Sequence, residues 1–204
     1  IAGCASKTPS AQEVAKPKEY FPDMKGCFLL YNVKTETYEK VINQDNCKLQ
    51  LPPASTFKVP LAVMAFDAGV LKDETVVLKW DGKKNERETD NHDHDAKTWM
   101  RDSVVWFSQR LTPKIGMKRI KKYLRDFYYG NQDFSAGITE AWLVAPDKEP
   151  ALKISAYEQT DFMQKLWTDK LLASKRAMKL TREITLLETS PKGFVLSGKT
   201  GSNF

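Results

Sequence analysis

Two short segments near the beginning of the sequence carry the residues expected of paired β-strands. Residues 26–33 (GCFLLYNV) are mostly apolar, and residues 38–42 (YEKVI) follow after the polar residues 34–37. Aromatic and β-branched side chains of this kind pack well on a sheet, and the polar residues between the two runs are typical of a turn. We therefore predict two strands, with the second returning beside the first.

The next segment predicts a buried helix. Residues 55–69 follow a Pro-Pro pair, which breaks the preceding chain. Ser55 lies near the expected N-terminus of the helix, and Gly69 is typical of a helix end. Apolar residues occupy most of the helix circumference, so we expect this helix to lie in the core.

Helical patterns predominate in the rest of the chain, after a polar and irregular stretch over residues 72–97. The expected helices cover residues 103–111, 113–125, 154–167 and 174–186, and a last short strand lies within residues 193–201. Strands at both ends with helices between them indicate an α+β fold. We expect an antiparallel sheet that is flanked by helices and interrupted by a mainly helical inserted subdomain.

The size and charge of the chain narrow the classes of protein it can be. With 204 residues and 41% hydrophobic residues, the sequence is that of one substantial globular domain. No apolar run reaches the roughly 20 residues that a membrane-spanning helix needs. The net charge of +6 would suit an anionic partner, but much of it lies in residues 114–125, where apolar positions form the stripe of an amphipathic helix. Because no nucleic-acid motif accompanies these residues, we favour a solvated helix face and predict no nucleic-acid partner.

The cysteines bear on location and on covalent structure. Cys4 follows Ile-Ala-Gly, which resembles the end of a bacterial lipoprotein signal, and a polar stretch after it has the composition of a tether. We therefore divide the chain into a signal remnant and tether (residues 1–19) and a globular domain (residues 20–204), with Cys4 as a candidate lipid anchor. For Cys27 and Cys47 the spacing leaves two alternatives open, a disulfide or two buried free thiols.

Ser55 and Lys58 form the first candidate for catalytic chemistry. Residues three apart lie on one face of a helix, so the hydroxyl and the amine can meet. A serine hydroxyl becomes a nucleophile when a neighbouring base takes its proton, and a lysine can be that base when burial lowers its pKa. The S-x-x-K motif is weak alone, since a capping serine followed by a surface lysine has the same letters.

The two histidines of the sequence strengthen the case for a lysine base. His92 and His94 both lie in the polar run DNHDHD, so a well-held imidazole for a Ser-His-Asp triad is not expected. Histidine and aspartate can also bind metals, but the run lacks a familiar ligand spacing. We therefore favour a solvated loop over a metal site at these residues.

The end of the sequence contains a misleading match. Residues 193–200 (GFVLSGKT) fit the P-loop pattern G-x-x-x-x-G-K-[ST] letter for letter. A phosphate-binding loop needs a strand before it and a helix beginning at its Lys-Thr. Here the intervening residues are themselves strand-like, and Gly-Ser-Asn after the threonine opposes a helix, so we reject phosphate binding.

If the same residues lie on a strand edge, they supply a K-T-G motif. An S-x-x-K motif followed later by K-T-G resembles the penicillin-interacting serine enzymes. Two further motifs and a tryptophan then resemble those of the class D β-lactamases, and the resemblance runs from about Tyr20 to the chain end. It implies the β-lactamase/transpeptidase-like fold. The elements that carry it are Ser55-x-x-Lys58, Ser103-Val104-Val105 (S-x-V), Tyr129-Gly130-Asn131 (Y-G-N), Trp142 and Lys199-Thr200-Gly201.

The resemblance also implies roles for these residues. Lys58 is expected to react with CO2 to give a carbamate, which takes the proton of Ser55 as the hydroxyl attacks the β-lactam carbonyl and later activates the deacylating water. The Trp142 indole N–H is expected to hold this carbamate, and Val105 to keep its pocket dry. Taken alone, Trp142 and Val105 would be ordinary core residues. No metal and no other cofactor is expected.

The remaining expectations concern proton transfer and the substrate. Ser103 would pass a proton to the departing lactam nitrogen, with Lys199 supplying positive potential to it and to the substrate carboxylate. Thr200, Gly201 and Ser202 would line the substrate site, with Thr200 as a hydrogen-bonding neighbour. The backbone N–H groups of the nucleophilic serine and of Ser202 would form the oxyanion hole.

The resemblance implies hydrolysis of penicillins and oxacillin-type β-lactams, antibiotic resistance and a periplasmic location in a Gram-negative bacterium. The candidate lipid anchor at Cys4 rests on the sequence before that cysteine and is not expected across the family. Such relatives continue after K-T-G with further strands and a C-terminal helix, so we expect the catalytic domain here to be incomplete. Two alternatives are a β-lactam sensor, which stays acylated, and a cell-wall transpeptidase, which would carry S-x-N where this chain has S-x-V.

Overall fold

The computed structural model describes residues 14–15, 26–144 and 150–202. None of the helices in these ranges has the length and apolar composition needed to cross a bilayer. The strands are β1 (Val14–Ala15), β2 (Phe28–Asn32), β3 (Thr37–Ile42), β4 (Leu186–Thr189) and β5 (Val195–Ser197). The helices are α2 (Gln44–Lys48), η1 (Ala54–Phe57), α3 (Lys58–Asp67), η2 (Glu88–Asp90), α4 (Ala96–Asp102), α5 (Val105–Ile115), α6 (Met117–Asp126), α7 (Ala156–Trp167) and α8 (Lys175–Ile184), where η marks 3-10 helices.

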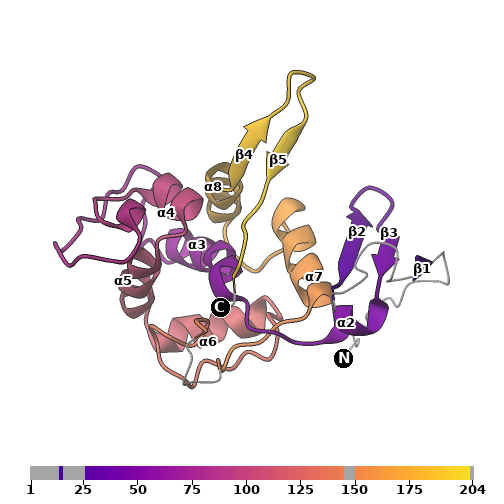
Figure 1. Cartoon of the computed structure of the whole chain (residues 1–204), viewed down its shortest axis with the longest axis horizontal. Coiled ribbons are helices and arrows are strands. Elements are labelled where there is room, and N and C mark those ends of the chain that lie inside the picture. The colour runs from indigo at the N-terminus through magenta and orange to yellow at the C-terminus, as the bar shows by residue number, and fades with distance from the viewer. Residues whose placement is uncertain (1–13, 16–25, 145–149, 203–204) are drawn as a thin grey trace.

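The strands near the N-terminus form the predicted hairpin. β2 and β3 pair antiparallel, and β1 adds to the other edge of β3 in parallel, which gives the order β1-β3-β2. The predicted last strand is β5, but its partner β4 was not predicted, and it begins at Leu186, the last residue of the helix that we expected over 174–186. β4 and β5 form a separate antiparallel pair, which projects from the body of the molecule (Figure 1). In the described ranges this pair does not join the N-terminal sheet, in contrast to the single completed sheet that we expected.

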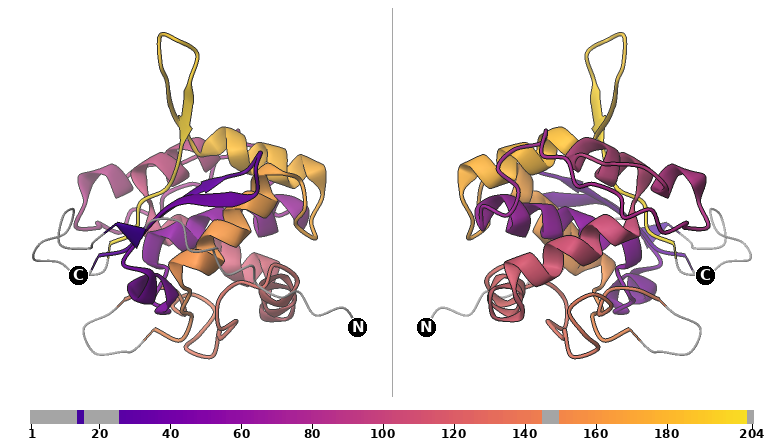
Figure 2. Two further views of the ribbon diagram at one scale, coloured as in Figure 1. Left: turned by 90° about the vertical axis from the view of Figure 1, so that its right-hand side faces the viewer. Right: turned by 90° about the vertical axis from the view of Figure 1, so that its left-hand side faces the viewer.

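Helix α3 forms the centre of the core, as predicted. Every residue from its first lysine to Phe66 is buried, because apolar side chains surround the helix on all sides. α3 packs against α8 and α5, inside the helical body that Figure 2 shows from two sides. The helix that carries the S-x-x-K motif is therefore held rigidly from several directions.

The boundaries of the central helices differ from those that we predicted. Pro113 was expected to begin a helix, but it lies inside α5, and the break falls at Gly116, whose φ of 87° is readily available only to glycine. Helix α4 was missed, although Asp95 and Thr98 form a capping box at its start.

The loop before α4 is irregular as expected, but His94 in this loop is only 1% exposed. The expectation of a solvated loop is therefore wrong for His94, and it is right for the exposed His92.

Cys27 and Cys47 form a disulfide, with their Cα atoms 5.2 Å apart. Of the two alternatives that the spacing left open, this is the first. The bond ties the start of the β2–β3 hairpin to helix α2. Cys4 and the proposed lipoprotein signal lie outside the described residues, and of the predicted tether only Val14–Ala15 is described, as strand β1.

Candidate active site

Ser55 and Lys58 meet at the junction of η1 and α3. Ser55 lies in η1, Lys58 is the first residue of α3, and the Lys58 Nζ lies 3.1 Å from the Ser55 Oγ. The three-residue spacing places both side chains on one face of the continuous helical segment. Ala54, immediately before the serine, has a φ of 46°, a conformation that costs a non-glycine residue energy and that clusters at functional sites. The helix start therefore fixes the hydroxyl next to the amine.

The pKa of the Lys58 amine lies close to neutral pH. The side chain is 0% exposed, and burial lowers its pKa from 10.5 to about 7, helped by the nearby cations of Lys199 and Arg87 and opposed by the Asp90 carboxylate. Burial acts in this direction because it removes water from the charged ammonium form. At pH 7 about half of the amine is therefore neutral and can accept a proton or react as a nucleophile.

Trp142 brings a buried, unused hydrogen-bond donor. Its indole ring is fully buried and stacks on Phe57, with ring centroids 5.2 Å apart, and on Phe134, at 5.9 Å. The Trp142 Nε1 is also buried, and it has no hydrogen-bond partner among the described residues. An indole N–H can only donate, and leaving a buried donor unpaired costs about 1–3 kcal/mol. A group that accepts this hydrogen bond would remove that cost.

Ser103 and Val104 form a turn between two helices, so the second helix begins at Val105 and not at Ser103 as predicted. Ser103 ends α4 in the left-handed conformation, with a φ of 61°, and its backbone N–H donates to the Trp99 carbonyl. Val104 is buried, while Val105 begins α5 and is half-buried. The left-handed residue stops α4 so that the serine projects from a fixed corner of the fold.

The K-T-G segment lies against the turn that carries Ser55. A Cβ added to Gly201 would lie 3.0 Å from both the Pro53 carbonyl oxygen and the Thr56 Cγ2, so a larger residue would force these neighbours to move. The Lys199 Nζ donates to the Thr200 carbonyl at 3.0 Å, and burial and the Arg87 cation lower the pKa of Lys199.

The structure thus places the K-T-G motif beside the S-x-x-K motif, although the two lie far apart in the sequence. Thr200 and Ser202 are exposed on the same segment as Lys199 and Gly201. Val195–Ser197 is itself the strand β5, and the four residues from Lys199 to Ser202 are not helical. The phosphate-binding loop that we rejected therefore lacks the helix that it would need.

The Y-G-N motif shapes the chain that leads into α7. Gly130 has a φ of 54°, and a Cβ at this position would lie 2.0 Å from the Lys153 carbonyl oxygen. Asn131 holds the same segment, because its Nδ2 donates to the Ala151 carbonyl at 2.7 Å. This clamp positions α7, from which the Gln159 side chain donates to the Thr56 Oγ1 at 2.9 Å, next to the nucleophile.

Arg87 and Asp90 belong to the electrostatics of the site, and we did not predict them. The Arg87 guanidinium forms an ion pair with Asp90 and donates to the Asp102 carbonyl at 2.6 Å, immediately before Ser103. The Asp90 carbonyl in turn accepts the Trp106 Nε1–H at 2.8 Å. These residues lie in the irregular loop, where no periodicity in the sequence indicates which side chains point inward.

A cavity of about 170 Å³ borders the same turn without containing the Ser–Lys pair. It lies between η1, the start of α7 and the K-T-G segment. Its lining includes Pro53, Thr56, Ser155, Gln159 and Gly201, but neither Ser55 nor Lys58. The cavity therefore provides open space beside the turn that carries Ser55, but the reacting side chains do not line it.

Comparison with known proteins connects this geometry to one family. The family model described as penicillin binding protein transpeptidase domain matches residues 26–203. The chain is 42% identical to beta-lactamase OXA-1 of Escherichia coli, an alignment that covers 100% of the chain and 73% of OXA-1. It is 40% identical to beta-lactamase OXA-48 of Klebsiella pneumoniae over 73% of the chain and 54% of OXA-48. Part of each relative's length thus lies outside the match.

Superposition on solved structures indicates the same family. The class D beta-lactamase BAT-2 delta mutant superposes with a TM-score of 0.86 at 36% identity, over 92% of this chain and 77% of that one. FUS-1 (OXA-85), a class D beta-lactamase from Fusobacterium nucleatum subsp. polymorphum, superposes with a TM-score of 0.84 at 28% identity, over 92% and 76%. The expected fold class is therefore confirmed.

Proposed function

The chain belongs to the class D β-lactamase family, and on that premise we propose that it hydrolyses penicillins and oxacillin-type β-lactams through an acyl-enzyme on Ser55. One observation carries the proposal above all others. Lys58, 3.1 Å from the serine hydroxyl, is fully buried and has its pKa lowered to about 7. Such an amine can exist without a proton at neutral pH, as a base for this serine must.

The residues around Lys58 fit the carbamate that the family resemblance implies. CO2 adds only to a neutral amine, which burial provides here, and the unpaired Trp142 Nε1–H is a donor suited to a carbamate oxygen. When it is present, the carbamate supplies the general base for both acylation and deacylation. Val105, half-buried at the start of α5, limits access of water to this position.

The other side chains bind the substrate and move the second proton. Ser103, fixed by the end of α4, passes a proton to the lactam nitrogen as the ring opens, and the base that took the Ser55 proton returns one to the Ser103 hydroxyl. The ammonium of Lys199 attracts the substrate carboxylate, and Thr200 and Gly201 line the same edge. The backbone N–H groups of Ser55 and Ser202 stabilise the oxyanion. The close approach of Gly201 to the Ser55 turn supports this grouping.

We also propose a periplasmic location with a lipid anchor at Cys4, where hydrolysis would protect the cell wall enzymes from antibiotics. The Cys27–Cys47 disulfide supports an oxidising compartment, because such bonds persist in the periplasm and not in the reducing cytosol.

Reaction of the full-length protein with a chromogenic cephalosporin tests the proposal. We expect many turnovers per protein molecule, and none for Ser55→Ala. Added bicarbonate should raise the rate, and Lys58→Ala should trap the acyl-enzyme. A single equivalent of product followed by a stable adduct on Ser55 in the parent protein would contradict hydrolysis and favour the β-lactam sensor. Absence of any reaction would contradict both.

A further inference from the structure

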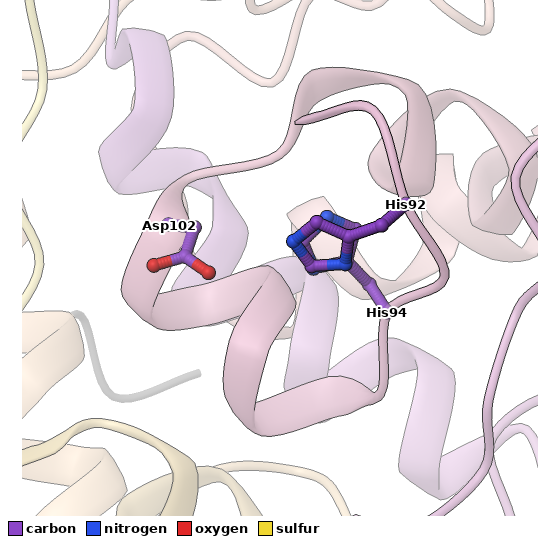
Figure 3. A group of neighbouring side chains, drawn as sticks. All are labelled: His92, His94 and Asp102. Carbon is purple, nitrogen blue, oxygen red and sulfur yellow. The ribbon is translucent and has the colours of Figure 1, made fainter. Parts of the chain in front are cut away.

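A group of metal-binding side chains lies on the loop before α4 and at the end of that helix. Figure 3 shows the rings of His92 and His94 overlapping, with the Asp102 carboxylate beside them. The ring centroids of the two histidines are 4.0 Å apart. One nitrogen from each ring and one carboxylate oxygen all lie within 4.8 Å of one another. The active-site proposal uses none of these three residues.

The hydrogen bonds of the two rings leave one lone pair free on each. The His94 Nε2 lies 3.0 Å from the Thr89 carbonyl, which can only accept, so Nε2 carries the hydrogen and Nδ1 carries the lone pair. In the same way, the Asp93 carbonyl 2.7 Å from the His92 Nδ1 leaves the lone pair on Nε2. Carbonyl groups that fix the ring tautomer in this way are typical partners of metal-binding histidines.

The free nitrogen of His94 is the independent observation that points to a ligand. The His94 Nδ1 is buried and has no hydrogen-bond partner within the described ranges, while the whole residue is 1% exposed. A buried acceptor without a partner destabilises the folded state, and a bound cation would remove that cost. Core packing alone gives no reason to place a polar nitrogen there.

Asp102 completes the set as an anionic ligand. Both of its oxygens accept hydrogen bonds from the Arg101 guanidinium at 2.7 Å, but the Arg101 side chain is largely exposed. One of these hydrogen bonds can therefore give way to a metal and be replaced by water. Arg87 and Lys79, two cations of the same loop, form ion pairs with Asp90 and Asp93.

We propose that His92, His94 and Asp102 bind a Zn²⁺ ion, with water as the fourth ligand. Two imidazole nitrogens and one carboxylate oxygen suit zinc, whereas Ca²⁺ and Mg²⁺ favour sites made of oxygen ligands alone. Zn–N bonds of about 2.0–2.1 Å place tetrahedral ligands about 3.3 Å apart, so the ligand atoms must approach by up to about 1.5 Å. The exposed His92 can make this movement. The ion would connect the loop to the end of α4, one residue before Ser103.

Titration of the full-length protein with ZnCl2, followed by calorimetry, tests the site. Every protein carries Cys4→Ser, because a free thiol is itself a strong zinc ligand. We expect one Zn²⁺ per chain. His92→Ala should weaken binding by at least tenfold, the minimum seen even when only a partner of a zinc ligand is removed. Glu88→Gln removes an exposed carboxylate of the same segment from outside the group, so it should bind zinc like the parent.

Nitrogen-15 NMR of the imidazole rings separates this site from binding elsewhere. Zn²⁺ should shift the His94 Nδ1 and His92 Nε2 signals and leave the nitrogens that face the Thr89 and Asp93 carbonyls nearly unchanged. CaCl2 at the same concentration should shift neither. The proposal is wrong if ZnCl2 produces no saturable binding, if His92→Ala binds it as tightly as the parent, or if the histidine signals stay in place. Because His92 is exposed, its substitution leaves the core intact.

Discussion

Replacement of Trp142 by phenylalanine separates two roles of this side chain, which are packing in the core and donation of a hydrogen bond. Phenylalanine retains an aromatic ring between Phe57 and Phe134 but removes the buried, unpaired Nε1–H. If that N–H holds a carbamate on Lys58, its loss removes a hydrogen bond to a charged group, worth about 1.5–3 kcal/mol. At 1.36 kcal/mol for each factor of ten, we expect Trp142→Phe to need about 10–100-fold more bicarbonate for half-maximal activity.

The assay is the turnover of a chromogenic cephalosporin in buffers freed of CO2 and then supplied with increasing NaHCO3. Trp99→Phe is a matched control, because Trp99 is also fully buried but its Nε1–H already has a partner, the Ser108 Oγ at 3.0 Å. The control variant should lose stability, since it leaves the Ser108 hydroxyl unpaired, and it should keep the bicarbonate requirement of the parent. A carbon-13 NMR signal of the carbamate should weaken in Trp142→Phe alone.

An unchanged bicarbonate requirement in Trp142→Phe would refute the role of the indole N–H. An equal change in both tryptophan variants would refute it as well, because the effect would then come from general loosening of the core. A lower maximal rate at saturating bicarbonate would not by itself support the role, since displacement of Lys58 has the same consequence.

Three further predictions concern stability, each measured by urea unfolding in CO2-free buffer. Burial and nearby cations lower the pKa of Lys58 from 10.5 to about 7, so unfolding takes up a proton between these pH values and the parent should gain stability as pH rises from 7 to 10. Lys58→Met should be more stable than the parent at pH 7, by up to about 4 kcal/mol, and the difference should shrink by pH 10. Gly130→Ala should destabilise severely or fail to fold, because the new Cβ would meet the Lys153 carbonyl 2.0 Å away at a φ of 54°. The double variant Cys27→Ser and Cys47→Ser should lose about 3 kcal/mol, as expected for a loop of 20 residues, and dithiothreitol should no longer affect its midpoint.

Local spacing allowed the central part of the site to be predicted from sequence. The Ser55–Lys58 contact follows from helix geometry, and the burial of Lys58 follows from the apolar residues around the helix. The tryptophan and the Y-G-N motif could be assigned only by resemblance. The structure supplies physical reasons for them, a buried unpaired N–H and a glycine whose Cβ position is blocked. Neither reason can be read from one sequence, because both depend on neighbours distant in the chain.

The fold shows the same division between local and distant information. The hairpin β2–β3 and the helix α3 follow from short-range patterns and were predicted. The placement of β4 beside β5, away from the first sheet, depends on strand pairing between segments and was not. The burial of His94 was also missed, because a run of polar residues normally indicates solvent, and only the folded loop turns this ring inward.

The neutral amine of Lys58 depends on three separate parts of the chain. Lys58, Arg87 and Lys199 bring three cations together, and each of the other two lowers the pKa of Lys58. The Asp90 carboxylate raises the pKa of Lys58, but this carboxylate also forms an ion pair with the Arg87 guanidinium. Of the three cations, Lys58 is the most deeply buried and therefore loses its proton most readily. The base thus results from burial by α3 and from charges that the irregular loop and the K-T-G segment bring to it, which the S-x-x-K motif alone could not reveal.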